Sequence, residues 1–305
     1  MMIELPQRCF IGRVNPKWFA RVRPLYLNYT GSEVLTDYQV KCVFTHADIP
    51  FGKLRADKQD LLFVDSNNEA IPYWLEEANA SKIVVWLKFH KIETGKEVFW
   101  LYFGNSRFSG PSSGDEIFIF FDDFEGTSLD ANKWNTYNDG GSYSVSNSMV
   151  RVTGYQIISK TYQITDGIIE VKEKITALEG SIFARAEGNS GNQWVHSYGL
   201  GSGDFGAGKE WNLAIAEDNK PKFWDTTQAI QNEWLLLRFT LNGDHLKGER
   251  FKYADMSPNG GPVEGTLTKY SSGYIGLRTT GNDRTCYYDW ILVRKYAEPE
   301  PFIEV

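Results

Sequence analysis

The chain has little of what would indicate a metal protein or a disulfide scaffold. It holds only three cysteines, at positions 9, 42 and 286, and four histidines among 305 residues. The cysteines are odd in number, far apart and never in a CxxC pair, and the histidines show no HxH or HxxxH spacing. This pattern predicts neither a disulfide framework nor a zinc site, and it leaves open whether any cysteine pair is oxidised.

Long apolar runs and positive charge are also lacking. No run approaches the ~20 apolar residues of a membrane span. The net charge is -7, so the chain has no general attraction to nucleic acid. The N-terminal sequence MMIELPQRCFIGRV has no apolar stretch of the kind found in secretory signals. We therefore expect no membrane span and no nucleic-acid partner. The chain either stays in the cell or leaves by another route, such as lysis or as part of a virion.

Aromatic residues, in contrast, are abundant. They make up 15% of the chain, beside 28 glycines, and hydrophobic residues reach 42%. This composition favours strands and turns over helices and provides enough apolar material for folded cores. Large rings of this kind fill the cores of β-sandwiches, and they also stack on sugars.

Period-two alternation and turn clusters predict two all-β domains. The Gly- and Ser-rich stretch 104–116 indicates a boundary, so we place an N-terminal β-sandwich at 1–110, a linker at 111–116, a second domain at 117–298 and a tail at 299–305. A short helix capped by Ser128 is expected at 128–135. Short strands at close spacing predict a double-sheet jelly roll in the second domain. The expected strands are 117–124, 142–152, 155–163, 167–175, 180–187, 193–200, 209–216, 221–225, 233–241, 247–254, 264–269, 272–279 and 285–296.

Both ends of the second domain resemble a known family. FFDDFEG at 120–126, with LD at 129–130 and KW at 133–134, resembles the first strand of concanavalin A-like lectin/glucanase (laminin-G-like) domains. YDWILVRKY at 288–296 resembles their last strand. The resemblance implies a concanavalin A-like jelly roll that holds glycans on its concave face.

The first ~110 residues resemble a β-domain family of unknown function that often precedes lectin-like domains in archaeal and bacterial surface proteins. The matching stretches, in order, are YQV at 38–40, DLLFVD at 60–65, IPYWLE at 71–76, IVVWLK at 83–88 and LYFGN at 101–105. This resemblance implies no established activity.

Alternation indicates the candidate sugar-binding side chains. Residues 183, 185 and 187 should share one face of a strand, as should residues 194, 196 and 198. Two further tryptophans follow, one after the glycine-rich loop and one in the next strand. Rings can stack on sugars while Arg, Glu and His bond hydroxyls; an ordinary buried sheet face is the alternative interpretation. The candidates are Arg185, Glu187, Trp194, His196, Tyr198, Trp211 and Trp224.

The glucanase resemblance also implies a structural calcium ion. In those relatives the aspartate that matches Asp289 helps to bind it. Backbone oxygens near Asp123 and Ser148 would complete the site, and calcium prefers such oxygen ligands. The alternative is that Asp289 only hydrogen-bonds a turn.

The paired carboxylates of the glucanases are missing. No Glu-x-Asp-x-Glu occurs, and alternation places Glu170 and Glu173 on opposite faces. Glu187 and Glu210 remain a pair that neighbouring strands can bring together. The glycine-rich stretch 199–211 matches the sequence patterns of phosphate-binding loops. Its flanks are strand-like, however, so no nucleotide site is predicted.

The sequence thus predicts a noncatalytic protein of a cell surface or virion that recognises carbohydrate in adhesion, attachment or decoration. Its expected partners are a glycan or glycosylated surface, a second copy of the chain, or other proteins of the virion or surface layer. Two alternatives remain: a purely structural assembly component, and an atypical glycan-cleaving enzyme.

Overall fold

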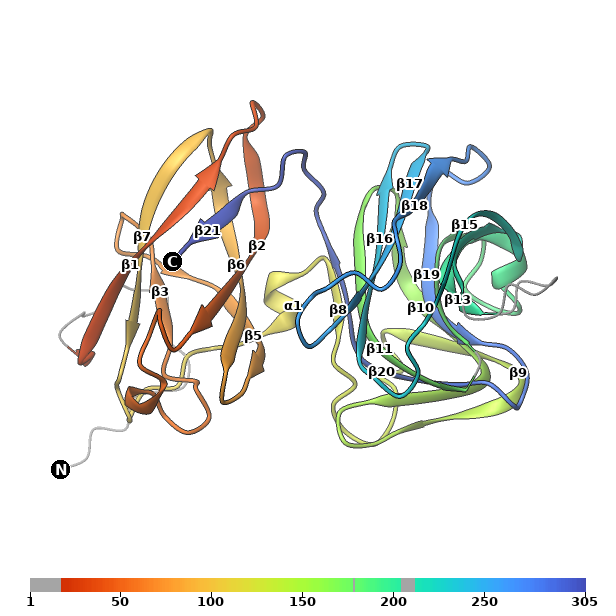
Figure 1. Ribbon diagram of the computed structural model, residues 1–305, viewed down its shortest axis with the longest axis horizontal. Coiled ribbons are helices and arrows are strands. Elements are labelled where there is room, and N and C mark those ends of the chain that lie inside the picture. The colour runs from red at the N-terminus through yellow and green to blue at the C-terminus, as the bar shows by residue number, and fades with distance from the viewer. Residues whose placement is uncertain (1–17, 178, 204–211) are drawn as a thin grey trace. The chain divides into compact units, whose positions relative to one another are not determined.

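Strands dominate both units of the chain, as predicted. The computed structural model describes residues 18–177, 179–203 and 212–305. The chain folds into two compact units (Figure 1). The first comprises Met1–Phe118 and Ala297–Val305, and the second comprises Ile119–Tyr296. Within the described residues, no helix is long and apolar enough to cross a membrane.

The first unit packs two antiparallel sheets around one core. One sheet has the order β21-β1-β7-β3-β4 and the other β2-β6-β5. In β6, Ile83, Val85 and Leu87 alternate into the core, as a half-buried strand should. The elements are β1 (Arg21–Tyr29), β2 (Leu35–Thr45), the 3-10 helix η2 (Phe51–Lys53), β3 (Leu62–Val64), β4 (Ala70–Ile71), β5 (Tyr73–Ala78), β6 (Lys82–Ile92), β7 (Gly95–Phe103), α1 (Gly114–Ile117) and β21 (Phe302–Glu304).

The stretch expected as a linker, residues 111–116, instead folds onto the first unit. The hydroxyl of Ser112 accepts a hydrogen bond from the Leu75 amide at 2.8 Å. The Ser113 hydroxyl then accepts one from the Glu116 amide and begins helix α1. A Ser-rich segment can therefore supply side-chain caps to a fold, and composition alone did not distinguish that role from a linker.

The expected tail at 299–305 also belongs to the first unit. It forms β21, which pairs antiparallel with β1 through Tyr26↔Glu304, Leu27↔Ile303 and Asn28↔Phe302. Ile303 and Val305 pack against the core of this unit. The strand was not predicted because it has only three residues, follows a run of acidic residues and prolines, and pairs with a strand far away in the sequence.

Two neighbouring substitutions should reveal how much β21 contributes. Ile303→Ser removes an apolar contact with the core, and we expect it to lower the unfolding free energy of the first unit by about 1–2 kcal/mol. Phe302 points to solvent with 57% of its surface exposed, so Phe302→Ser should change that free energy by less than ~0.5 kcal/mol. Urea unfolding compares the two variants, and equal losses would show that β21 is not seated as described.

The second unit has two sheets that share one strand. Residues Tyr155–Ile164 of β10 pair with β19, whereas Val150–Thr153 pair with β20. The elements are β8 (Phe120–Asp122), β9 (Trp134–Val145), β10 (Val150–Ile164), β11 (Gly167–Ala177), β12 (Gly180–Ala186), the 3-10 helix η3 (Trp194–His196), β13 (Tyr198–Gly203), β14 (Asn212–Glu217), β15 (Lys220–Gln228), β16 (Leu235–Asn242), β17 (His245–Lys252), β18 (Val263–Thr266), β19 (Gly273–Thr279) and β20 (Thr285–Arg294).

Gly154 allows β10 to pass from one sheet to the other. Its φ is +52°, and a Cβ there would lie 2.5 Å from the carbonyl oxygen of Gly281. Any larger residue would clash, so glycine is needed at this corner. The two sheets then enclose the main core of the unit, which includes Val152, Ile182, Leu237 and Leu277.

The prediction and the structure differ in three places. The expected strand 142–152 spans the end of β9, a turn at 146–149 and the start of β10, which then runs on without the break expected before 155. Each strand range expected in the second unit overlaps an observed strand. The helix expected at 128–135 is wrong, because a turn at Asp130 leads directly into β9 at Trp134. The range 193–200 is not one strand, because it begins with the helix η3 before β13 starts at Tyr198.

Candidate functional site

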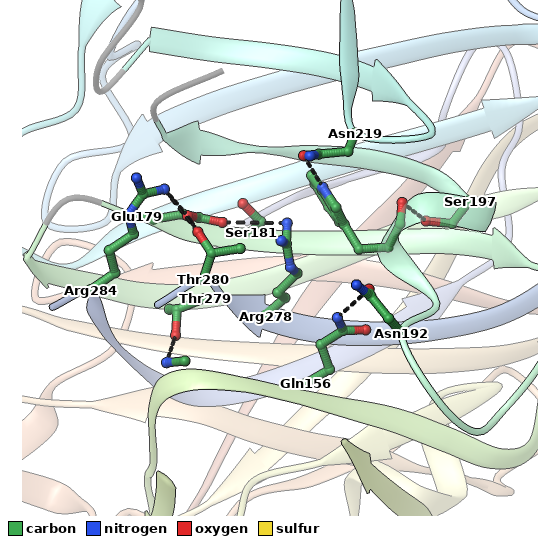
Figure 2. Close-up of polar contacts among 12 residues, drawn as sticks. Gln156, Glu179, Ser181, Asn192, Ser197, Asn219, Arg278, Thr279, Thr280 and Arg284 are labelled. Atoms are coloured by element: carbon green, nitrogen blue, oxygen red, sulfur yellow. Dashed lines mark hydrogen bonds and ion pairs between the residues drawn. The ribbon is translucent and has the colours of Figure 1, made fainter. Parts of the chain in front are cut away.

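A row of residues crosses one sheet of the second unit on the face that points away from the main core, and most of its members are buried. The strands of this sheet lie in the order β15-β14-β13-β12-β19-β10-β9. Neighbouring positions in the register bring together seven residues, which we call the Trp224–Tyr137 row (Figure 2 shows three of them, Ser181, Arg278 and Gln156): Trp224, Ala214, Gly201, Ser181, Arg278, Gln156 and Tyr137. The residues that alternate with the row in β12, β19 and β10 face the core.

Arg278 is the central charge of this row. Its side chain is only 5% exposed, and its guanidinium lies 4.4 Å from the ring centroid of Trp194. Its Nη1 is 3.6 Å from Oε1 of Glu179, and its buried Nε has no hydrogen-bond partner. Burial lowers the pKa of Arg278 to about 10, against the attraction of Glu179 and Asp139. The side chain thus stays cationic at neutral pH and keeps an unused donor.

Glu179 is shared between two arginines. Its carboxylate accepts hydrogen bonds from the Thr280 hydroxyl and from Nη1 of Arg284, the latter at 2.7 Å (Figure 2). The hydroxyl of Ser181, the neighbour of Arg278 in the row, is buried without a partner. This part of the sheet face therefore has more hydrogen-bonding capacity than its own contacts use.

Gln156 anchors the segment that precedes η3. Its amide Nε2 donates to Oδ1 of Asn192 at 2.7 Å (Figure 2), and its Oε1 accepts from the Gln193 amide at 3.1 Å. These bonds hold residues 192–193 against the sheet and so place Trp194, the next residue, on the same face.

The side chain of Trp194 packs against the face of the sheet. Its ring lies over Gly199, where a Cβ would come within 2.1 Å of it, and its indole N–H donates to Asn219. The ring is buried. The prediction that 194, 196 and 198 share one face is wrong, because η3 has helical periodicity. His196 is exposed instead, with Nδ1 3.6 Å from Glu187.

Arg185 and Tyr198 lie away from the row. A bulge follows Phe183, and Arg185 has a φ of +51°, so the expected shared face of 183, 185 and 187 does not form. The buried guanidinium donates to backbone carbonyls of Thr165, Tyr270 and Gly243 and to the carboxylate of Asp166. The Tyr198 hydroxyl accepts from the Tyr270 amide inside the core.

Two other expected residues differ in their placement. Trp224 begins the row and is 45% exposed. Trp211 lies outside the described residues. Sequence reasoning missed Ser181, Arg278, Gln156 and Tyr137, although one signal was available. In β19, Arg278 alternates with Ile275 and Leu277 as the only charged residue of an apolar strand.

The residues expected to bind calcium make other contacts. Oδ2 of Asp289 lies 2.7 Å from the ammonium of Lys172, which already neutralises its charge. Burial raises the pKa of Asp123, and Glu125 and Asp122 raise it further. Among the described residues, no three His, Cys, Asp or Glu side chains converge as a metal site. The expected site combines one carboxylate with backbone oxygens and does not require such a cluster, so the calcium ion stays a prediction.

The described carboxylates flanking β12 are poorly placed for glycoside hydrolysis. Glu179 and Glu187 stand at opposite ends of this strand, so at ~3.3 Å per residue their backbones are more than ~20 Å apart. Hydrolysis uses a pair separated by about 5–9.5 Å. Glu210, the expected partner of Glu187, lies outside the described residues.

The second unit is an all-β fold of antiparallel strands arranged like a jelly roll, as its alternation and turn spacing predicted. Residues 57–137 match the family "Domain of unknown function (DUF2341)", which confirms the resemblance proposed for the first domain. No curated protein matches the chain.

Several solved structures are similar to the chain. The carbohydrate-binding module CBM66 from Bacillus subtilis is 15% identical, over 57% of this chain and 98% of that one, with a TM-score of 0.37. A legume lectin-like domain from Entamoeba histolytica is 13% identical, over 54% and 91%, with a TM-score of 0.41. A β-1,3-glucanase from Mycobacterium marinum is 13% identical, over 61% and 100%, with a TM-score of 0.37.

Proposed function

We propose that this protein recognises carbohydrate without cleaving it, through the Trp224–Tyr137 row. The observation that carries the proposal is the composition of the row. An aromatic ring stands at each end, and hydrogen-bonding side chains with unused capacity lie between them. The rings at the two ends are the accessible part of the row, because Trp224 is 45% exposed and Tyr137 is partly exposed, whereas the residues between them are buried.

The length of the row indicates an extended ligand. Seven strands are separated by six spacings of ~4.8 Å, which gives a row of about 29 Å. In this proposal an oligosaccharide stacks on the rings at the two ends, and the segment 192–194 moves aside so that donors such as Arg278 reach its hydroxyls. The setting we propose is the surface of a cell or virion, where the protein would serve adhesion, attachment or decoration.

Affinity electrophoresis through gels that carry a panel of neutral polysaccharides tests this function. We expect at least one glycan to retard the protein, and Trp224→Ala to weaken binding about tenfold because it removes an exposed ring from the row. Trp18→Ala is the matched control, because Trp18 is 52% exposed but lies in the first unit.

Three results would count against the proposal: no retardation by any glycan, equal losses for the two tryptophan variants, or release of reducing sugar. The same gels run with calcium and with chelator test the calcium ion expected at Asp289.

A further inference from the structure

A second row of side chains lies on the outer face of the other sheet. The register pairs Arg151 of β10 with Tyr287 of β20, and Tyr287 with Lys174 of β11. Glu173 pairs with Leu235, so Trp234, the residue just before β16, lies opposite Lys174. We call these four residues the Arg151–Trp234 row. Alternating neighbours such as Val152, Ile175 and Tyr288 are in the core, so the row faces outward.

Lys174 is held in this row by rings instead of carboxylates. Its ammonium is 4.8 Å from the ring centroid of Trp234 and 5.3 Å from that of Tyr287. Among the described residues, no carboxylate lies within ion-pair distance of it. A cation–π contact orients an ammonium but accepts few of its hydrogen bonds, so the N–H donors remain available to another group.

Arg151 also has hydrogen-bond donors that its own contacts do not use. Its guanidinium makes one long hydrogen bond, 3.4 Å from Nη2 to the Thr285 hydroxyl, and no ion pair with a described residue. Lys172, two residues before Lys174, differs because Asp289 pairs with it at 2.7 Å. The row therefore carries two uncompensated positive charges on a chain whose net charge is -7.

We propose that the Arg151–Trp234 row binds an acidic polysaccharide, one that carries carboxylate or sulfate groups. The two cations are separated by two strand spacings, about 10 Å, which suits acidic groups spaced along a sugar chain. The rings of Tyr287 and Trp234 add apolar surface beside the two cations. Charge complementarity selects the ligand, because a guanidinium and an ammonium bind such anions by charge-assisted hydrogen bonds.

A nucleic acid is a poorer fit for this surface. Duplex DNA carries one charge per ~1.7 Å, and its binding relies on many cations along the backbone. Here two cations stand on an acidic chain. The proposal goes beyond the function proposed above and does not depend on it, because the two rows lie on different sheets.

Affinity electrophoresis with polygalacturonate at low salt tests the proposal. We expect polygalacturonate to retard the protein, Lys174→Gln and Arg151→Gln each to weaken binding about tenfold, and the double variant to abolish it. Added salt should weaken binding by the parent more steeply than binding by either single variant. Lys96→Gln removes the same charge from the first unit and should change little.

Trp224→Ala should leave this binding intact, so that failure of the first site and failure of the second are distinguishable. Thermal melting of each variant checks that it is folded. The proposal is overturned if no acidic polysaccharide retards the protein, if Lys96→Gln weakens binding as much as Lys174→Gln, or if a DNA oligonucleotide of equal charge is bound as tightly.

Discussion

Replacing Arg185 with leucine is expected to lower the unfolding free energy of the second unit by about 3 kcal/mol or more. The guanidinium bonds the carbonyls of Thr165, Tyr270 and Gly243, which belong to separate turns. Without it these acceptors lose their donors, and each buried group left unpaired costs about 1–3 kcal/mol. Arg185→Lys should recover only part of the loss, since an ammonium cannot reproduce the planar fork of donors.

Urea unfolding followed by tryptophan fluorescence measures this effect. Arg151→Leu is the matched control, because Arg151 is half-buried with one long hydrogen bond, and its removal should cost less than ~1 kcal/mol. A stable Arg185→Leu variant that has lost glycan binding would contradict the structural role. It would instead support the binding role that alternation predicted from the sequence.

Glu173→Gln is expected to stabilise the protein at pH 8 and to have little effect near pH 4.5. Burial raises the pKa of Glu173 from 4.5 to about 7, although the charge of Arg250 opposes the shift. Between these two values the folded state holds a proton that the unfolded state has released. The stability of the parent therefore falls as the pH rises from 4.5 to 7, by up to about 3 kcal/mol.

Glutamine removes this penalty because it carries no charge at any pH. The variant and the parent should therefore differ most above pH 7, where the glutamate is ionised in both states. Unfolding curves at pH 4.5, 6 and 8 make the comparison, with Glu187→Gln as the control because it makes the same change at an exposed side chain. A parent whose stability rises between pH 4.5 and 7, with no gain for the variant, would show that Glu173 titrates normally.

The strands of the second unit could be predicted because their apolar residues alternate, and alternation is a local property. The faces could not always be predicted. A bulge in β12 turns Arg185 out of the row that its spacing indicates. The helix η3 likewise separates Trp194 from Tyr198. Both departures depend on local φ values and hydrogen bonds with distant loops, and these leave no mark on the alternation of the sequence.

The Trp224–Tyr137 row could not be predicted from the sequence for a different reason. Ser181, Arg278 and Gln156 become neighbours only because β12, β19 and β10 are adjacent in the sheet. These strands are far apart in the sequence, so their order is set by long-range packing. Trp224 was found because it lies in the strand expected after the glycine-rich loop, which is a local feature of the sequence.

The pairing of β21 with β1 makes the second unit an insertion within the first. A ribosome must complete residues 119–296 before the strand that covers the edge of β1 is made. Until then the nascent first unit presents an uncovered strand edge, which is a template for pairing with other chains. The jelly roll can therefore finish folding first, contrary to the usual N-terminal-first order, and a chain cut before residue 302 keeps that edge open permanently.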